Sequence, residues 1–325
     1  MRHLRAVTDA PTQPAARTSA PAGPVAAPGP VPADWARMAL LTCLWGSAFA
    51  TIEVALETLS PLVIVMLRMW LGAAFLLTVA AIVRAPLPRL LPRPDPAWKW
   101  LAAVGLVGNT IPFFLIPWAQ QTVNSGMTGI VISSAPLFVA VLAHFLAGER
   151  ITRRRSAGLA VAFLGVIVLF APTLSAEAGP GYAMAVGALL LTAVLYAFTV
   201  ILARFSTHKS LIGGAAGVCL VAAIATTPLG LWDATTNGLE FSARSGAAIL
   251  ALGAGPTALA TITYLALARS AGPGFLSLTN YLVPVFAVTL GAVALNETFG
   301  WNALAALGLI LLGLLLAGRR PKLRA

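Results

Sequence analysis

The chain has 325 residues, of which 59% are hydrophobic and only 10% charged, and its mean hydropathy is +0.89. Soluble domains carry about 25% charged residues, so this composition excludes an ordinary soluble protein and favours a membrane protein. The two cysteines, Cys43 and Cys219, lie in separate apolar segments without metal-ligand spacing, and neither a metal site nor a cofactor is predicted.

Ten hydrophobic segments follow a proline-rich start. Residues 1–33 hold seven prolines among alanines and are predicted to form a disordered cytoplasmic tail. Each later segment approaches the roughly 20 residues that a helix needs to cross about 30 Å of hydrocarbon. The ten spans are expected at 35–54, 62–83, 98–119, 126–146, 157–171, 182–203, 211–232, 247–268, 275–295 and 301–317, with a basic cytoplasmic tail at 319–325.

The chain has a net charge of +11, and its lysines and arginines lie mainly in alternate loops between these segments. If the N-terminus is cytoplasmic, 19 of the 21 lysines and arginines fall in cytoplasmic segments, with Arg244 in an outer loop and Arg68 inside a span. This distribution predicts a multi-pass protein of a bacterial-type inner membrane with both termini in the cytoplasm. The excess of basic residues therefore reflects membrane orientation, and no nucleic-acid partner is expected.

The sequence repeats itself at an offset of 148 residues, which aligns Pro136 with Pro284 and Glu149 with Glu297. The two units are expected at 34–171 and 181–318. Because each holds five spans, an odd number, the second unit would cross the membrane in the opposite sense to the first. The predicted fold is an all-α integral membrane protein with ten transmembrane helices in two inverted five-helix repeats. Secondary transporters are built in this way, with the substrate near the midplane between the repeats.

Several motifs resemble those of the EamA-type transporters of the drug/metabolite transporter superfamily. They are Trp45-Gly-Ser-Ala-Phe, Ser60-Pro-Leu followed by Arg68, and the paired Pro-Leu-Phe…Gly-Glu and Pro-Val-Phe…Asn-Glu segments. The resemblance extends from about residue 35 to 318. It implies an exporter of small metabolites or amphiphilic compounds, with a central cavity lined by spans one, three, four, six, eight and nine. Family members often have a lysine near the end of the first span, where this chain has Glu53.

Arg68 and Glu53 form the expected ion pair within the membrane. Arg68 lies well inside the second span, and a charge near the bilayer centre costs about 2.5 to 3.5 kcal/mol unless it finds a partner. Glu53 lies at a similar depth on the first span. The pair either holds the two spans together, or lines an outer gate at which Glu53 exchanges protons during transport.

Polar and aromatic residues in six spans are candidates for the wall of a substrate cavity. Pro136 and Pro284 are predicted to kink their helices and to free the carbonyls of Ile132 and Asn280, for which a water-filled cavity provides partners. The alternative is that the prolines, and each of the candidates, only serve helix packing. The candidates are Trp45, Asn109, Ser133, Tyr196, Thr257, Thr261, Tyr264, Ser277, Asn280 and Tyr281.

These features predict a secondary transporter, not an enzyme. It would export small amphiphilic metabolites such as amino acids or their derivatives by alternating access, with or without proton coupling. Facilitative or uptake transport by the same fold is the alternative. An intramembrane enzyme is a remote one, since no catalytic residues are predicted: the sequence has no Gly-x-Ser-x-Gly or His-Glu-x-x-His motif. Substrate identity, transport direction, coupling ion and oligomeric state do not follow from the sequence.

Overall fold

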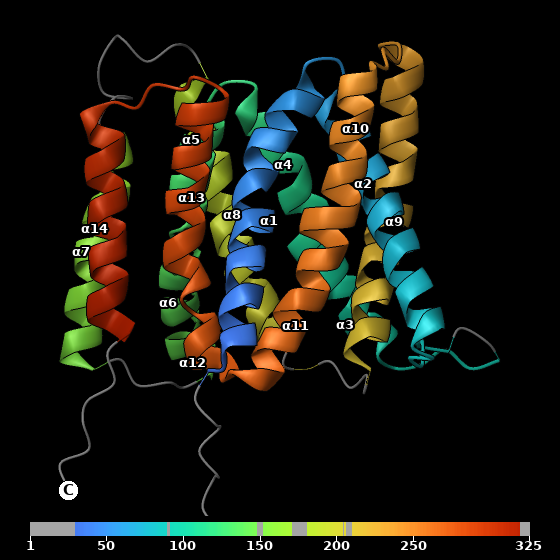
Figure 1. Ribbon diagram of the computed structural model, residues 1–325, viewed down its shortest axis with the longest axis horizontal. Helices are drawn as coiled ribbons and strands as arrows, with labels where there is room; N and C mark the ends of the chain where they lie inside the picture. The colour runs from blue at the N-terminus through green and yellow to red at the C-terminus, as the bar shows by residue number, and fades with distance from the viewer. Residues whose placement is uncertain are drawn as a thin grey trace, which may run out of the picture.

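A computed structural model describes residues 30–89, 92–147, 152–170, 181–203, 205 and 210–318. Within these ranges the regular structure is entirely helical. Most helices run nearly parallel or antiparallel along one direction, and α1 begins at the same end of the bundle at which α14 ends (Figure 1). The predicted tails at 1–33 and 319–325 lie outside the described residues, apart from residues 30–33, and so does Glu149.

The predicted spans correspond to single helices, to continuous helices with a π-helical stretch in the middle (the third and eighth spans), or to helices that are interrupted (the fourth and ninth spans). The elements are α1 (Pro32–Leu56), α2 (Pro61–Ile82), α3 (Trp98–Val104), η1 (Gly105–Thr110), α4 (Ile111–Gln120), α5 (Ser125–Ile132), α6 (Ala135–Ala147), α7 (Arg153–Phe170), α8 (Tyr182–Ala203), α9 (Leu211–Thr236), α10 (Ala243–Leu252), η3 (Gly253–Leu259), α11 (Ala260–Ser270), α12 (Gly272–Leu276), α13 (Thr279–Ala294) and α14 (Trp301–Gly318).

Eight helical segments of the described chain are long and apolar enough to cross a membrane. The expected spans at 157–171 and 301–317 are the two shorter ones. The apolar part of α14 comprises 17 residues, and α7 comprises 18, of which the first three are arginines. An all-helical membrane protein is therefore confirmed, and the helices α1 and α9 extend beyond the predicted spans to include Asp34 and Asp233.

Two helical segments widen into π-helices, η1 and η3, which begin 148 residues apart at Gly105 and Gly253. Asn109 in η1 and Thr257 in η3 occupy the same position of the repeat, since they too are 148 residues apart. A π-helix is rare and is found frequently at functional sites. α2 packs against η3, and α9 packs against η1. Each π-helix thus contacts a helix from the other half of the sequence.

Contacts between the two halves also hold the bundle together elsewhere. α7 and α14 lie side by side at one edge of the bundle, and α2 and α9 lie side by side near the other (Figure 1). Between them, α1 packs against α13, α10 and α11. The largest group of buried apolar side chains includes residues of both halves, such as Ile52 and Ile130 from the first and Leu189 and Ile310 from the second.

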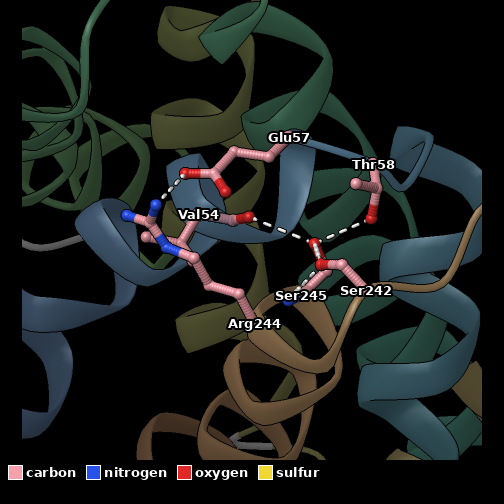
Figure 2. Close-up of polar contacts among 6 residues, drawn as sticks. All are labelled: Val54, Glu57, Thr58, Ser242, Arg244 and Ser245. Atoms are coloured by element: carbon pink, nitrogen blue, oxygen red, sulfur yellow. Dashed lines mark hydrogen bonds and ion pairs between the residues drawn. The ribbon is translucent and has the colours of Figure 1, made fainter.

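Polar side chains join the α1–α2 turn to the start of α10 at the upper end of the bundle (Figure 2). Ser245 is completely buried, and its hydroxyl accepts hydrogen bonds from Thr58 at 2.8 Å and from Ser242 at 3.0 Å. Beside them, Arg244 forms an ion pair with Glu57 at 3.2 Å, although both side chains are exposed. We call this group the upper polar contact.

Two substitutions in the upper polar contact are expected to differ in effect. Ser245→Ala leaves Thr58 without its acceptor and should lower the free energy of unfolding by about 1 to 2 kcal/mol. Arg244→Ala should change it by less than about 1 kcal/mol, because solvent screens an exposed ion pair. Thermal unfolding of both variants in the same detergent measures the difference. An equal or larger loss in Arg244→Ala would contradict it.

Candidate functional site

Arg68 is the centre of a largely buried polar group between the helices. Its side chain extends from α2 and only 5% of the residue is exposed. The Nε donates a hydrogen bond to the Thr257 hydroxyl at 2.9 Å, and the guanidinium carbon lies 4.1 Å from the centre of the Phe113 ring. Thr257 in turn donates to the carbonyl of Leu252 at 2.8 Å, five residues earlier in the π-helical region. The bulge of η3 therefore orients the hydroxyl that receives Arg68.

Two further polar side chains lie near the guanidinium, and a third contacts one of them. Tyr196 from α8 and Cys219 from α9 lie close enough to interact electrostatically with Arg68. The amide nitrogen of Asn109 lies 3.9 Å from the Cys219 sulfur. Arg68, Thr257, Asn109, Tyr196 and Cys219 are called the Arg68 cluster below. Four of the five were predicted site residues, and they come from both halves of the sequence.

The predicted ion pair between Arg68 and Glu53 is wrong. Within the part of the chain that the structure describes, the two ion pairs are Arg37 with Asp34 and Arg244 with Glu57, and Arg68 belongs to neither. Arg68 instead turns toward η3 and α4, where Thr257 and Phe113 receive it. The sequence placed Arg68 and Glu53 at similar depths, but side chains at equal depth on adjacent helices meet only if they point toward each other.

Glu53 contacts Gln120 at the end of α4. The Gln120 amide nitrogen donates to the carbonyl of Phe49 at 2.9 Å and to the Glu53 carboxylate at 3.3 Å. The amide oxygen of Gln120 is enclosed and has no hydrogen-bond partner, and the residue is 4% exposed. Glu297 lies near enough for its charge to act on that of Glu53. Glu53, Gln120 and Glu297 are called the carboxylate cluster below.

Glu297 caps the start of α5. Its carboxylate accepts hydrogen bonds from the backbone nitrogens of Ser125 and Gly126, both at 2.9 Å, and from the Ser125 hydroxyl at 2.5 Å. The first backbone N–H groups of a helix lack intrahelical partners and carry partial positive charge, which explains why a carboxylate binds there. The sequence places Glu297 just after the ninth predicted span, but it does not show that Glu297 caps α5.

The fourth and ninth predicted spans are both broken, at positions that differ. α5 ends at Ile132 and α6 begins at Ala135, immediately before Pro136. In the other half, Pro284 lies in the interior of α13, and the break falls at Ser277 and Leu278, between α12 and α13. Kinks at Pro136 and Pro284 were predicted; the break in the first half falls beside Pro136, and the break in the second half lies almost two turns before Pro284.

The remaining candidate residues do not all face one space. Trp45 and Tyr264 meet with their ring centres 5.5 Å apart, and Tyr281 packs against the main apolar core. The hydroxyls of Ser133 and Thr261 donate to carbonyls of their own helical segments. Ser277 and Asn280 are exposed. The predicted set therefore contained most of the Arg68 cluster but also residues that the structure places outside it.

Two mostly apolar cavities flank α1. One, of about 400 Å³, lies between α1, α2 and η3, and the other, of about 440 Å³, lies between α1, α10 and α13. Thr51 lines both. Neither lining includes a residue of the Arg68 cluster or of the carboxylate cluster. Two contacting residues were not predicted. Phe113, beside Arg68, is apolar, and nothing in the sequence distinguishes it from the other apolar residues of its span. Gln120, beside Glu53, is a polar residue at the end of a predicted span, and that position could have identified it.

The profile of the EamA-like transporter family matches this chain twice, at residues 35–171 and 183–319. The chain belongs to the EamA-like transporter family. The two matches begin 148 residues apart, the same offset that separates η1 from η3. The resemblance found in the sequence motifs is thereby confirmed, and the protein is a multi-pass membrane transporter and not an enzyme.

Individual relatives agree with this assignment. Protein PagO of Salmonella typhimurium is 25% identical over 77% of this chain and 81% of its own length. An uncharacterised transporter of Archaeoglobus fulgidus is 30% identical over 43% of this chain and 48% of its own, so the match spans about half of that protein. A probable terminal-alkyne amino-acid exporter of Streptantibioticus cattleyicolor is 32% identical over 42% of this chain and 44% of its own.

A solved crystal structure has the same fold. Its sequence is 21% identical to this EamA-like transporter, and the TM-score is 0.62 over 88% of this chain and 97% of the other. At this identity the similarity concerns the fold alone.

Proposed function

We propose that this EamA-like transporter is a secondary transporter that exports small amphiphilic metabolites, such as amino acids or their derivatives, across a bacterial-type inner membrane. The observation that carries the proposal is the Arg68 cluster, a buried polar group to which both halves of the chain contribute. The name of the S. cattleyicolor relative supports an amino-acid substrate. Two aromatic side chains, Tyr196 within the cluster and Phe113 beside it, suit an amphiphilic solute.

The proposed mechanism is alternating access between two inverted repeats of five spans. Several elements support it by recurring 148 residues apart: η1 and η3, and the 18-residue helices α7 and α14. In this arrangement the end of the bundle where α1 begins and α14 ends is cytoplasmic, and the upper polar contact faces outward (Figure 1). Arg244 belongs to that outer end, which fits the charge distribution of the loops.

Counterflow in proteoliposomes tests the proposed function. Purified protein is reconstituted into vesicles loaded with an unlabelled amino acid, and entry of the labelled compound is followed with and without a pH gradient. A panel of apolar and aromatic amino acids should include compounds that exchange. Faster entry of the labelled compound when the vesicle interior is the more acidic side would support a proton-coupled exporter. Exchange without any pH effect would support a facilitative carrier. If no compound exchanges, the proposed substrate class is wrong.

Proton coupling is proposed to involve Glu53. Its half-buried carboxylate is close to the charge of Glu297 and receives one hydrogen bond, from Gln120. With one hydrogen-bond donor and no ion-pair partner among the described residues, the Glu53 carboxylate is suited to take up and release a proton. The exposed Glu57, just after the end of α1, pairs with Arg244 and provides a matched control.

Glu53→Gln is expected to abolish the effect of a pH gradient on transport while counterflow at equal pH continues, because glutamine can hold the hydrogen bond but cannot carry the proton. Glu57→Gln should keep the wild-type response. Transport by both variants is measured in the same vesicles at several gradients. A wild-type pH response in Glu53→Gln would exclude this residue from the coupling mechanism.

A further inference from the structure

The guanidinium of Arg68 has unused hydrogen-bonding capacity. In the described part of the chain its one hydrogen bond uses Nε, which leaves both Nη groups without a protein acceptor. The enclosed side-chain atoms without a partner are found in Thr42, Thr110 and Gln120, so the Nη groups of Arg68 are not sealed off. The edge of the guanidinium that carries the Nη groups is therefore not completely enclosed and has no hydrogen-bond acceptor among the described residues.

No carboxylate of the described chain neutralises this charge. The titratable side chains that act on it are a phenol, Tyr196, and a thiol, Cys219. Glu53 is held by Gln120, and Glu297 by the first turn of α5. An unpaired cation in the low-dielectric interior is unfavourable, and buried charges are normally paired. The Arg68 guanidinium at the centre of the cluster therefore has no anionic partner among the described residues.

The neighbours of Arg68 orient it for one kind of anion. Thr257 holds Nε, and the guanidinium carbon lies over the Phe113 ring, 4.1 Å from its centre. These two contacts restrain the guanidinium and leave its two Nη groups without an acceptor among the described residues. Two parallel N–H donors on a rigid plane match the two oxygens of a carboxylate.

We propose that the Nη edge of Arg68 binds the carboxylate of the transported solute, with Thr257 as a positioning residue. The inference rests on the proposed function in taking the transported solute as the ligand, and it narrows the substrate class. The solute bears a free carboxylate next to an apolar or aromatic portion that packs near Phe113. A compound without the carboxylate leaves the buried cation unpaired and binds weakly.

A binding experiment on the wild-type protein tests this directly. The full chain in lipid nanodiscs is titrated with L-phenylalanine, L-phenylalaninamide and 2-phenylethylamine, and with the corresponding leucine series, while the unfolding temperature is recorded. At least one of the acids should bind at least tenfold more tightly than its amide and amine. Equal binding of acid, amide and amine would overturn the proposal, and so would the absence of binding by either acid. Stabilisation by sodium chloride equal to that by the acids would also overturn it, because the anion site would then be unselective.

Variants test the assignment to Arg68. Arg68→Gln should remove the preference for acid over amide, and Arg68→Lys should restore part of it. Since Arg68→Gln is at a buried position and can fail to fold, Thr257→Val offers a second route: loss of the hydroxyl frees the guanidinium and should weaken acid binding several-fold, whereas Thr257→Ser should not. An unchanged acid preference in folded Arg68→Gln or in Thr257→Val would exclude this arrangement.

The counterflow assay separates this inference from the proposed function. Acid-specific binding without exchange of any compound would contradict transport of this class and leave the carboxylate site standing. Exchange of amides and amines as fast as that of the acids would support transport and overturn the carboxylate site.

Discussion

Glu297→Ala is expected to lower the free energy of unfolding by about 3 kcal/mol, because two backbone N–H groups and the Ser125 hydroxyl lose a charged acceptor at the start of α5. The space around the carboxylate is closely filled. A side chain added at Gly126 would collide with Phe299, and one added at Gly291 would collide with Glu297 itself. Thermal unfolding in detergent measures the change.

Two control variants separate the cap from a general effect of charge removal. Glu297→Gln keeps one acceptor oxygen and should lose roughly half as much stability as Glu297→Ala. Glu240→Ala removes an exposed carboxylate from the loop before α10 and should leave the unfolding temperature nearly unchanged. If Glu297→Ala unfolds at the same temperature as Glu240→Ala, the cap does not stabilise the fold.

Gly313→Leu is expected to be equally damaging, because α7 and α14 approach closely at this residue. A Cβ added to Gly313 would lie 2.5 Å from the Ala162 Cβ and 2.5 Å from the carbonyl oxygen of Gly158. The opposing Gly158 is as tightly packed, with the Ala317 nitrogen 2.6 Å from the position of an added Cβ. Small residues allow such backbone contact between helices in a membrane. Because backbone atoms cannot move aside as a side chain can, leucine should cost about 3 kcal/mol or separate the two helices.

The same helix provides the matched control for this variant. Gly308 also lies in α14, and a Cβ added there would meet no atom within 4 Å. Gly308→Leu should therefore unfold at nearly the wild-type temperature, and should even gain slightly from the higher helix propensity of leucine. Differential scanning fluorimetry of the two variants gives the comparison. Similar unfolding temperatures for Gly313→Leu and Gly308→Leu would show that α14 can pack elsewhere.

The contact between α7 and α14 also shows what a sequence repeat can indicate. The 148-residue offset aligns Gly165 of α7 with Gly313 of α14, and likewise the other residues of the two helices. It does not reveal that these two helices pack against each other, since the same repeat is compatible with other pairings. Contact between α7 and α14 depends on how the two halves associate, which is decided by the shapes of the packed surfaces.

Sequence alone determined the helical class, the approximate ends of the helices and the family. The reason is that long apolar segments and the motifs repeated 148 residues apart can be read locally along the chain. Arg68, Asn109, Tyr196 and Thr257 were selected as polar or aromatic residues within predicted spans, and their role in substrate binding stays a prediction. The positions of η1 and η3 had no comparable signal, because a π-helix differs from an α-helix by one inserted residue per turn.

Tertiary structure alone decided which residues meet. Arg68 was expected to pair with Glu53, but it contacts Thr257, which is 189 residues away in the sequence. Glu297, 172 residues from Ser125, caps a helix of the other half. Such partners depend on the direction in which each side chain leaves its helix and on which helices pack together. These are properties of the assembled bundle. The Arg68 side chain leaves α2 in a direction away from Glu53, and its guanidinium therefore has no carboxylate partner among the described residues.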